Sequence, residues 1–335
     1  MTISVCMIVK NEERVLARCL DSLDGLYDEL VIVDTGSTDS TKAIAARYTD
    51  KIFDFKWIND FSAARNFAFS RATMEYIYSA DADEVLDEHN RKQFRLLKDN
   101  LLPEIEIVQM KYGNQLSNGT VYNFDEEYRP KLFKRLRQFV WIEPVHEQVR
   151  LDPVVFNSDI VITHMPETNH SGRDFAVFER ALEKDGMLSD RLWKMYAREL
   201  YISGSNEDFE RAEKHFAEKS EEVMTDDLFK DICVILARAA RIRKDTGGFF
   251  KYAVKLVAGD GCSEICMEMG RYYEDIGDWA EAAVWFFNAA YETTPILKAV
   301  EGDIEPLTHL TEIYDRLGDV ETARHYREEL AAHLH

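Results

Sequence analysis

The sequence is poor in basic residues, because 41 lysines and arginines stand against 62 aspartates and glutamates in a chain of 335 residues. The resulting formal net charge is −21. A surface with this excess of negative charge repels the phosphates of DNA and RNA, which excludes a nucleic acid as the main ligand. The hydrophobic content of 46% is that of a globular chain, and the length suggests two domains of ordinary size.

The sequence also lacks any apolar run of the about 20 residues that a membrane-spanning helix needs. No basic segment precedes the strand-like residues 2–9, so a signal peptide is not expected. The five cysteines are odd in number and scattered, and Cys262 and Cys266 have neither a nearby histidine nor a second cysteine pair to complete a metal site. We therefore expect reduced thiols in a cytoplasmic protein without a transmembrane segment.

The stretch Tyr76–Leu86 joins an apolar segment to three carboxylates. Residues 77–80 have the composition of a buried strand, and Asp81, Asp83 and Glu84 follow directly. Residues two apart on an extended chain point to one side, so Asp81 and Asp83 can aim at a common point. A hard cation such as Mg²⁺ or Mn²⁺ would offset their repulsion there. A solvated acidic turn is the alternative, because Asp-x-Asp alone is a weak signal.

Strand-like and helix-like segments alternate through the first 80 residues. The strand-like segments are 3–9, 30–33, 51–55 and 76–80, and the helix-like segments are 15–23, 41–48 and 61–72. This alternation predicts a parallel sheet with right-handed crossovers, in which ligands bind beyond the carboxyl ends of the strands. Polar residues 10–13, 34–39 and 81–84 all fall at that edge.

Shorter strands and a cluster of basic residues are expected after residue 105. The predicted strands are 105–112, 121–124 and 154–164, and the basic residues are Arg129, Lys131, Lys134, Arg135 and Arg137. The cluster could offset the charge of a diphosphate or of an anionic acceptor. It could equally form the polar side of strands.

Strand-like segments disappear after about residue 170. Gly270 and Tyr273, followed by Ala282 and Phe286, have the spacing of a tetratricopeptide repeat. In this repeat, small residues let two helices approach and a large aromatic residue fills the gap between them. Weaker copies occur around Ala212 with Phe216, Ala253, and Tyr314 with Gly318 and Ala323. An irregular helical bundle is the alternative.

Taken together, the motifs resemble those of the family 2 glycosyltransferases, which have the GT-A nucleotide-sugar fold. The resemblance covers about residues 1–165 and rests on MIVKNEE, VDTGSTD, WINDFSAARN, DADE and VHE. Within the family the sequence is most similar to the sublancin-type S-glycosyltransferase branch, which has a C-terminal tetratricopeptide-like region. The resemblance implies an α/β GT-A domain with a mixed, mostly parallel sheet at 1–170, a helical linker at 171–190 and an all-α tetratricopeptide-like domain at 191–335.

The resemblance also assigns residues to the side of the site that binds the sugar donor. Asn11 and Glu12 follow the first strand, where the family contacts uridine and ribose. Asp34 matches the acidic residue that reads the base, and it can cap the turn that follows it at the same time. Arg65 and Asn66 lie at the start of a helix whose family equivalent borders the nucleotide.

The metal and the catalytic base are assigned in the same way. Asp81 and Asp83 match the two aspartates of the metal motif, and Asp83 is the expected direct ligand of Mg²⁺ or Mn²⁺. His164 ends a strand where many GT-A enzymes place a further ligand, although a single histidine can also be structural. Glu147 in VHE matches the position of the general base, with His146 as its orienter or as a competing base. Many relatives have aspartate at this position, which leaves the base assignment open.

The expected function is an inverting, metal-dependent transfer of a hexose from a UDP-sugar to an acceptor. A peptide or protein side chain is the expected acceptor, because repeat arrays offer an extended concave surface. The alternatives are a polysaccharide or lipid-linked sugar acceptor, or a non-catalytic peptide-binding protein. The intact DADE and VHE motifs argue against the non-catalytic alternative.

Overall fold

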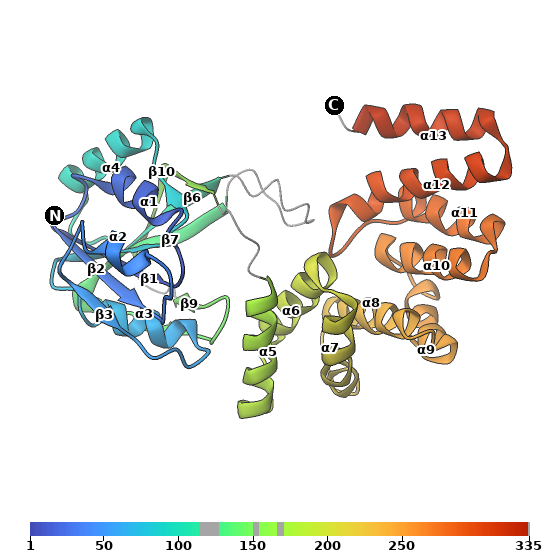
Figure 1. The fold of residues 1–335 in the computed structure, drawn as a ribbon, viewed down its shortest axis with the longest axis horizontal. Helices are drawn as coiled ribbons and strands as arrows, with labels where there is room; N and C mark the ends of the chain where they lie inside the picture. Colours follow the sequence, from blue (N-terminus) through green and yellow to red (C-terminus); the bar gives the residue numbers. More distant parts are fainter. Residues whose placement is uncertain (114–126, 150–153, 166–170, 334–335) are drawn as a thin grey trace. The chain divides into compact units, whose positions relative to one another are not determined.

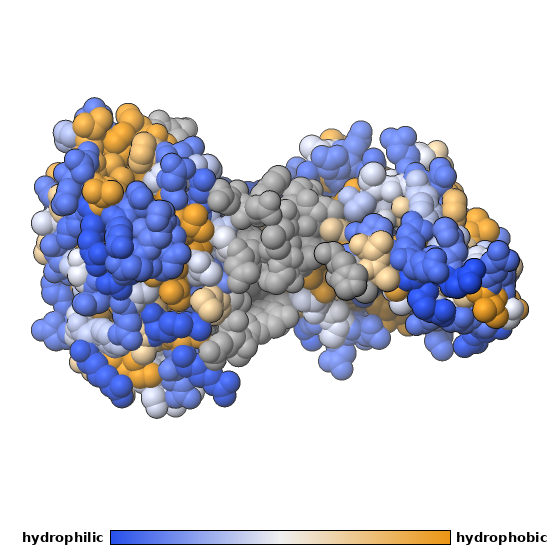
Figure 2. All heavy atoms as spheres, turned by 90° about the horizontal axis from the view of Figure 1, so that it is seen from above, coloured by the Kyte–Doolittle hydropathy of each residue, from blue (hydrophilic) through white to orange (hydrophobic). Residues whose placement is uncertain are grey.

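The computed structural model describes residues 1–113, 127–149, 154–165 and 171–333. Within these ranges the chain divides into two compact units, the first before residue 171 and the second from Ser171 onward (Figure 1). Polar and charged residues cover most of the surface in the view of Figure 2, as the high content of charged residues predicts. The predicted strand at 121–124 lies outside the described residues.

The first unit is built on one sheet, which has eight strands among the described residues in the order β3-β2-β1-β4-β7-β6-β10-β5. Strand β7 is antiparallel to β4 and β6, β5 is antiparallel to β10, and the other neighbours are parallel. The strands are β1 (Ile3–Val9), β2 (Glu29–Asp34), β3 (Ile52–Asp54), β4 (Tyr76–Ala80), β5 (Glu84–Val85), β6 (Ile107–Gly113), β7 (Glu127–Lys134) and β10 (Val155–His164). The predicted α/β class with a mixed, mostly parallel sheet is confirmed.

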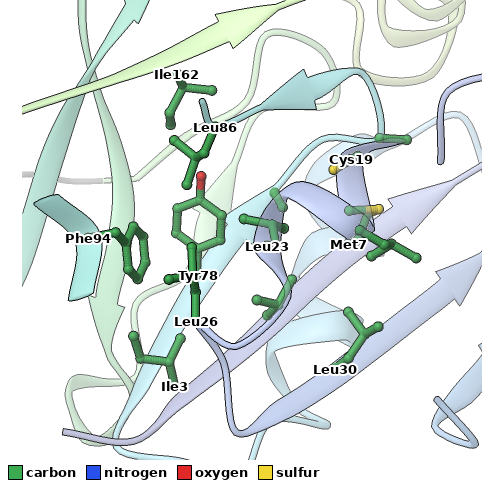
Figure 3. Packing of buried hydrophobic residues seen from close by; sticks show 14 of the residues in the cluster. Ile3, Met7, Cys19, Leu23, Leu26, Leu30, Tyr78, Leu86, Phe94 and Ile162 are labelled. Carbon is green, nitrogen blue, oxygen red and sulfur yellow. The ribbon is translucent and has the colours of Figure 1, made fainter. Parts of the chain in front are cut away.

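Helices cover both faces of this sheet. They are α1 (Leu16–Leu23), α2 (Thr41–Ala45), α3 (Phe61–Phe69) and α4 (Glu88–Asn100). Side chains alternate along a strand, so neighbouring strand residues enter different cores. Met7 and Tyr78 pack with residues of α1, α2 and α4, including Phe94, whose ring centroid is 5.4 Å from that of Tyr78 (Figure 3). Cys6 and Ile77 pack against α3 on the other face.

A short ribbon lies outside the main sheet and pairs β8 (Trp141–Ile142) with β9 (Gln148–Val149). The loop between these two strands carries the predicted base, Glu147. The ribbon itself was not predicted, because each of its strands has only two residues.

The second unit is entirely helical in its described residues. Its helices are α5 (Ser171–Asp185), α6 (Asp190–Ser203), α7 (Asn206–Lys219), α8 (Asp226–Ile242), α9 (Thr246–Val257), α10 (Ser263–Ile276), α11 (Trp279–Phe287), α12 (Ile304–Leu317) and α13 (Val320–His333). Short turns join α8 to α9, α10 to α11 and α12 to α13, and the members of each pair lie side by side (Figure 1). The segment predicted as a linker contains α5 and the start of α6.

None of the described helices is long and apolar enough to cross a membrane. All five cysteines are buried, and none is part of a disulfide.

The pairing of α10 with α11 follows the sequence pattern. A Cβ atom added to Gly270 would lie only 2.6 Å from the ring of Phe286, so the ring occupies the space that glycine leaves. Gly277 and Gly318 end α10 and α12 with φ angles of 81° and 79°, which favour glycine. The predicted contact between a small residue and an aromatic ring is therefore present in this helix pair.

We expect Gly270→Ala to lower the free energy of unfolding by about 1–3 kcal/mol, because overpacking displaces the Phe286 ring. Urea unfolding followed by circular dichroism measures the change. The matched control is Gly247→Ala in α9, where the nearest atom would be Asp245 Oδ1 at 3.7 Å. That substitution should stabilise the protein by up to about 1 kcal/mol through helix propensity. Stabilisation by both substitutions would contradict the close packing.

Candidate functional site

The ends of β1 and β2 are tied to each other by side chains of the two loops that follow them. The backbone N–H of Asn11 donates to Ser37 Oγ at 2.9 Å, and Asn11 Oδ1 accepts from the backbone N–H of Thr38 at 2.8 Å. The backbone N–H of Glu12 donates to Thr41 Oγ1 at 2.7 Å. Asn11 has a φ of 58°, a region that asparagine tolerates better than most residues. Both predicted donor-side residues therefore belong to one connected edge.

Asp34 is buried at the end of β2, and only one of its two carboxylate oxygens is hydrogen-bonded. Its Oδ1 accepts from the backbone N–H groups of Gly36 and Ser37, each at 2.9 Å, which is the predicted turn cap. Its Oδ2 is buried and has no hydrogen-bond partner in the described part of the chain. A buried acceptor without a partner is costly, so this oxygen is suited to a donor group that arrives with a ligand.

Arg65 connects the metal motif to the predicted base. It lies on α3, whose start is capped by Asp60, the acceptor of the Ala63 N–H at 2.9 Å. Nη2 of Arg65 is 2.8 Å from Asp81 Oδ1, and Nε forms an ion pair with Glu147. The sequence separation of these groups, 16 residues in one case and 82 in the other, shows that only the fold brings them together.

Asn66, the neighbour of Arg65, is bonded to the protein backbone. Its Nδ2 donates to the carbonyl of Trp141 at 2.9 Å, and its Oδ1 accepts from the Trp141 N–H at 2.8 Å. Trp141 is buried, and its ring packs edge-on against those of Phe69 and Phe133. The structure thus places Asn66 as the anchor of β8, and its position beside the nucleotide stays a prediction.

Asp83 and His164 meet at the edge of the sheet. His164 Nε2 lies 3.0 Å from Asp83 Oδ2, and both side chains are partly exposed. Strand pairing between β10 and β5 sets His164 opposite Glu84. The ring of Tyr112 lies beneath the imidazole, with centroids 5.4 Å apart. Across the described ranges no group of three His, Cys, Asp or Glu residues could hold a metal ion, and Asp83 and His164 lie together here as a pair.

Lys131 is a member of this site that sequence reasoning placed only in a general basic cluster. It is buried on β7, forms an ion pair with Glu84, and its Nζ lies 3.6 Å from Asp81 Oδ2. Burial acts to raise the pKa of Asp81, but the charges of Arg65 and Lys131 outweigh it and hold this pKa well below its usual value. In the sequence, Lys131 is a charged residue next to the apolar pair Leu132 and Phe133, which is a weak signal for a buried cation.

The other residues of the basic cluster mostly have structural partners. Lys134 donates to the Pro103 carbonyl, Arg135 donates to that of Met74, and Arg137 pairs with Glu106. Arg129 pairs with Glu127 at 3.2 Å, and its guanidinium carbon lies 4.1 Å from the centroid of the Tyr112 ring. Of these basic residues, Lys131 is the one that the structure pairs with carboxylates of the acidic turn.

We expect Lys131→Met to lower the free energy of unfolding by about 3–5 kcal/mol, because Glu84 would be left as an uncompensated buried charge. Urea unfolding at pH 7 measures the loss, and adding Glu84→Gln should recover much of it. Lys42→Met is the control. The Lys42–Asp54 pair is exposed, so its loss should lower the free energy of unfolding by less than about 1 kcal/mol. Equal losses in the two lysine variants would contradict the buried ion pair.

The loop between β8 and β9 holds Glu147 in an unusual backbone. Glu143 has a φ of 72° and His146 a φ of 47°, both in the left-handed region that residues with side chains seldom adopt. The backbone N–H of Phe61 donates to the Pro144 carbonyl at 2.9 Å, and Val145 is buried. Such backbone is retained where surrounding contacts enforce it, and it is concentrated at functional sites.

Residues 4–149 match the model of the family described as glycosyl transferase family 2. This part of the chain is a family 2 glycosyltransferase domain. The predicted GT-A class and the resemblance to the family are confirmed, and the site residues described above lie within residues 4–149, except for His164.

Three curated relatives match shorter stretches of the chain. A TPR repeat-containing protein of Synechococcus elongatus is 49% identical over 84 residues, 25% of this chain and 21% of that protein. The SPbeta prophage-derived glycosyltransferase SunS of Bacillus subtilis is 38% identical over 92 residues, 27% and 22% of the two chains. The lipopolysaccharide core biosynthesis glycosyltransferase LpsC of Rhizobium meliloti is 33% identical over 112 residues, which are 32% of this chain and 40% of that protein. The chain thus spans less than half the length of each.

Solved structures of similar proteins are more distant. TarS 1–349 of S. aureus has a TM-score of 0.38 at 15% identity, with 85% of this chain and 90% of that chain covered. Glucosyl-3-phosphoglycerate synthase from Mycobacterium tuberculosis, in complex with Mg²⁺ and UDP, has a TM-score of 0.38 at 17% identity, with 56% and 80% covered.

Proposed function

We propose that this chain is an inverting, metal-dependent glycosyltransferase that moves a hexose from a UDP-sugar to a peptide or protein side chain. The observation that carries the proposal is the shared guanidinium of Arg65, which joins Asp81 of the metal motif to Glu147 within a family 2 glycosyltransferase domain. Donor-side and acceptor-side groups are thereby adjacent, as a direct displacement requires.

The donor nucleotide would lie along the connected ends of β1 and β2. The unpaired Oδ2 of Asp34 can accept from an N–H of the uracil base, which would satisfy this buried oxygen. Asn11 and Glu12 line the same edge through their bonds to residues 37–41. UDP affinity should therefore fall in Asp34→Ala.

A divalent ion fits the charge of the site. The side chains there comprise four carboxylates and two basic groups, namely Asp81, Asp83, Glu84, Glu147, Arg65 and Lys131. The remaining two negative charges match one Mg²⁺ or Mn²⁺. Asp83 and His164 would hold it, since a carboxylate oxygen and an imidazole nitrogen both suit Mn²⁺. When bound, the ion would offset the charge that grows on the departing diphosphate.

Glu147 would act as the general base. It would take the proton from the acceptor nucleophile while that atom bonds to the anomeric carbon and the sugar–phosphate bond breaks. Attack from the side opposite the leaving UDP inverts the anomeric centre. His146, one residue earlier, remains the competing candidate.

The acceptor is proposed from the helical unit and from the resemblance to the sublancin-type branch. Stacked helix pairs such as α8–α9, α10–α11 and α12–α13 present an extended surface that suits a peptide better than a single sugar. The similarity to LpsC, whose name refers to lipopolysaccharide core biosynthesis, favours a second candidate, a sugar on a lipid-linked or polysaccharide acceptor.

The test is a screen of UDP-glucose, UDP-galactose and UDP-N-acetylglucosamine for UDP release, with and without EDTA. One donor should be hydrolysed, and Mn²⁺ or Mg²⁺ should restore the activity that EDTA removes. Mass spectrometry of peptides containing cysteine, serine or asparagine, set against lipid-linked sugars, then identifies the acceptor. NMR of the product reports the anomeric configuration. Retention of configuration, or release of UDP that is indifferent to EDTA, would refute the corresponding part of the proposal.

A further inference from the structure

Helix α3 and the segment that carries Glu147 are joined at three points. At the start of the helix, the Phe61 N–H donates to the Pro144 carbonyl at 2.9 Å. Further along, Asn66 exchanges two hydrogen bonds with the backbone of Trp141, and Arg65 forms an ion pair with Glu147 itself. These contacts span the whole loop from β8 to the base.

Asn66 acts on this segment as a neighbouring strand would. It gives one donor and one acceptor to the backbone of the same residue, Trp141, at 2.9 and 2.8 Å. Trp141 pairs with Val149 across the β8–β9 ribbon, so Asn66 bonds directly to the strand that begins the loop, and that strand pairs with the one that ends it. The loop needs such support because Glu143 and His146 both have positive φ angles.

Arg65 sets the direction of the Glu147 carboxylate. Its Nε pairs with Glu147, its Nη2 is 2.8 Å from Asp81, and its Nη1 donates to Ser79 Oγ at 3.1 Å. The guanidinium carbon lies 5.1 Å from the centroid of the Trp141 ring. A planar group held by three partners and one ring fixes the two carboxylates relative to each other, and a lysine cannot reproduce that geometry.

We infer that Arg65 and Asn66 are positioning residues for Glu147, and that neither contributes to nucleotide binding. The inference rests on the proposed function, because it takes Glu147 to be the base. It reassigns the Arg-Asn pair of WINDFSAARN from the donor side of the reaction to the acceptor side.

The test is a double-mutant cycle on the full chain. Arg65→Lys and Asn66→Ala are prepared alone and combined with Glu147→Gln. For each variant, calorimetry gives the dissociation constant of UDP, and kinetics give kcat and KM of sugar transfer. Each single variant should lose about 10–100-fold in kcat, the usual effect of removing a group that orients a functional residue. UDP affinity and the KM for the donor should stay within about twofold, well below the tenfold change that corresponds to 1.4 kcal/mol.

The cycle gives the decisive readout. In the Glu147→Gln background, Arg65→Lys and Asn66→Ala should each lower kcat by less than about a further threefold, because substitutions of residues that act as a unit do not have additive effects. Arg71→Gln is the control, since Arg71 is exposed and its guanidinium lies over the rings of Phe67 and Phe53. Thermal unfolding of every variant distinguishes a loss of positioning from a loss of folding. If Asn66→Ala unfolds, Arg65→Lys still tests the inference, because lysine keeps the positive charge.

Two results overturn the inference. One is a loss of UDP affinity of about tenfold or more in either variant, and the other is a full additional loss of kcat in the Glu147→Gln background. A wild-type protein that binds UDP but transfers no sugar refutes the proposed function instead. The failure of the inference and that of the function are therefore distinguishable.

Discussion

Glu147→Gln is expected to lower the rate of sugar transfer by about 10²–10⁴-fold while leaving UDP affinity almost unchanged. Glutamine is nearly isosteric and can still accept from Arg65 Nε, the ion-pair partner of Glu147, but it cannot take a proton. Single-turnover kinetics with saturating donor isolate the chemical step, and calorimetry with UDP measures donor binding. A large fall in kcat at constant UDP affinity is the expected result.

His146→Ala is the companion to that experiment. If His146 orients the loop, His146→Ala should lower the rate of sugar transfer much less than Glu147→Gln does. A crippled His146→Ala together with a nearly normal Glu147→Gln would show that the two roles are reversed. Glu143→Gln, in the same loop, is a further control because it also removes a carboxylate near the ribbon.

Asp83→Ala is expected to reduce metal-dependent hydrolysis of the donor by on the order of 10²–10³-fold, because an ion that offsets diphosphate charge supplies several kcal/mol. Asp83 faces His164 and is partly exposed, so its loss should leave the fold intact. Release of UDP as a function of Mn²⁺ concentration measures activity, and electron paramagnetic resonance of Mn²⁺ measures binding without any turnover.

Asp54→Ala is the matched control for the metal experiment. Asp54 ends β3 in an exposed pair with Lys42, so its substitution removes a carboxylate from the same unit without touching the acidic turn. Unchanged hydrolysis with Mn²⁺ in Asp83→Ala would remove this residue from the metal site. His164→Ala should weaken Mn²⁺ binding as well if the imidazole is a ligand.

The strands and the polar edge could be predicted because their signals are local. Segments 3–9, 30–33 and 76–80 are nearly continuous apolar runs, and each proved to be a buried strand of the sheet. Polar residues follow each run, and parallel strands place their carboxyl ends together. The sequence alone therefore predicts Asn11, Asp34 and the acidic turn at one edge of the sheet.

The partners of these side chains could not be predicted, because they come from distant parts of the chain. Lys131 reaches Glu84 across 47 residues from a strand that runs antiparallel to its neighbours, and nothing in the sequence states that register. The bonds between Asn66 and Trp141 cross 75 residues. A motif shows which groups are present, whereas the sheet order decides which of them meet.

The sequence by itself determined the class of the fold, the family of the first unit and the set of groups able to carry the chemistry, because hydrophobic periodicity and short motifs are properties of neighbouring residues. Only the tertiary structure decided that Arg65 joins Asp81 to Glu147, that Lys131 is buried against Glu84, and that Asn66 anchors β8. The physical reason is that ion pairs and hydrogen bonds depend on distances of about 3 Å, and those distances are set by how the strands and α3 pack.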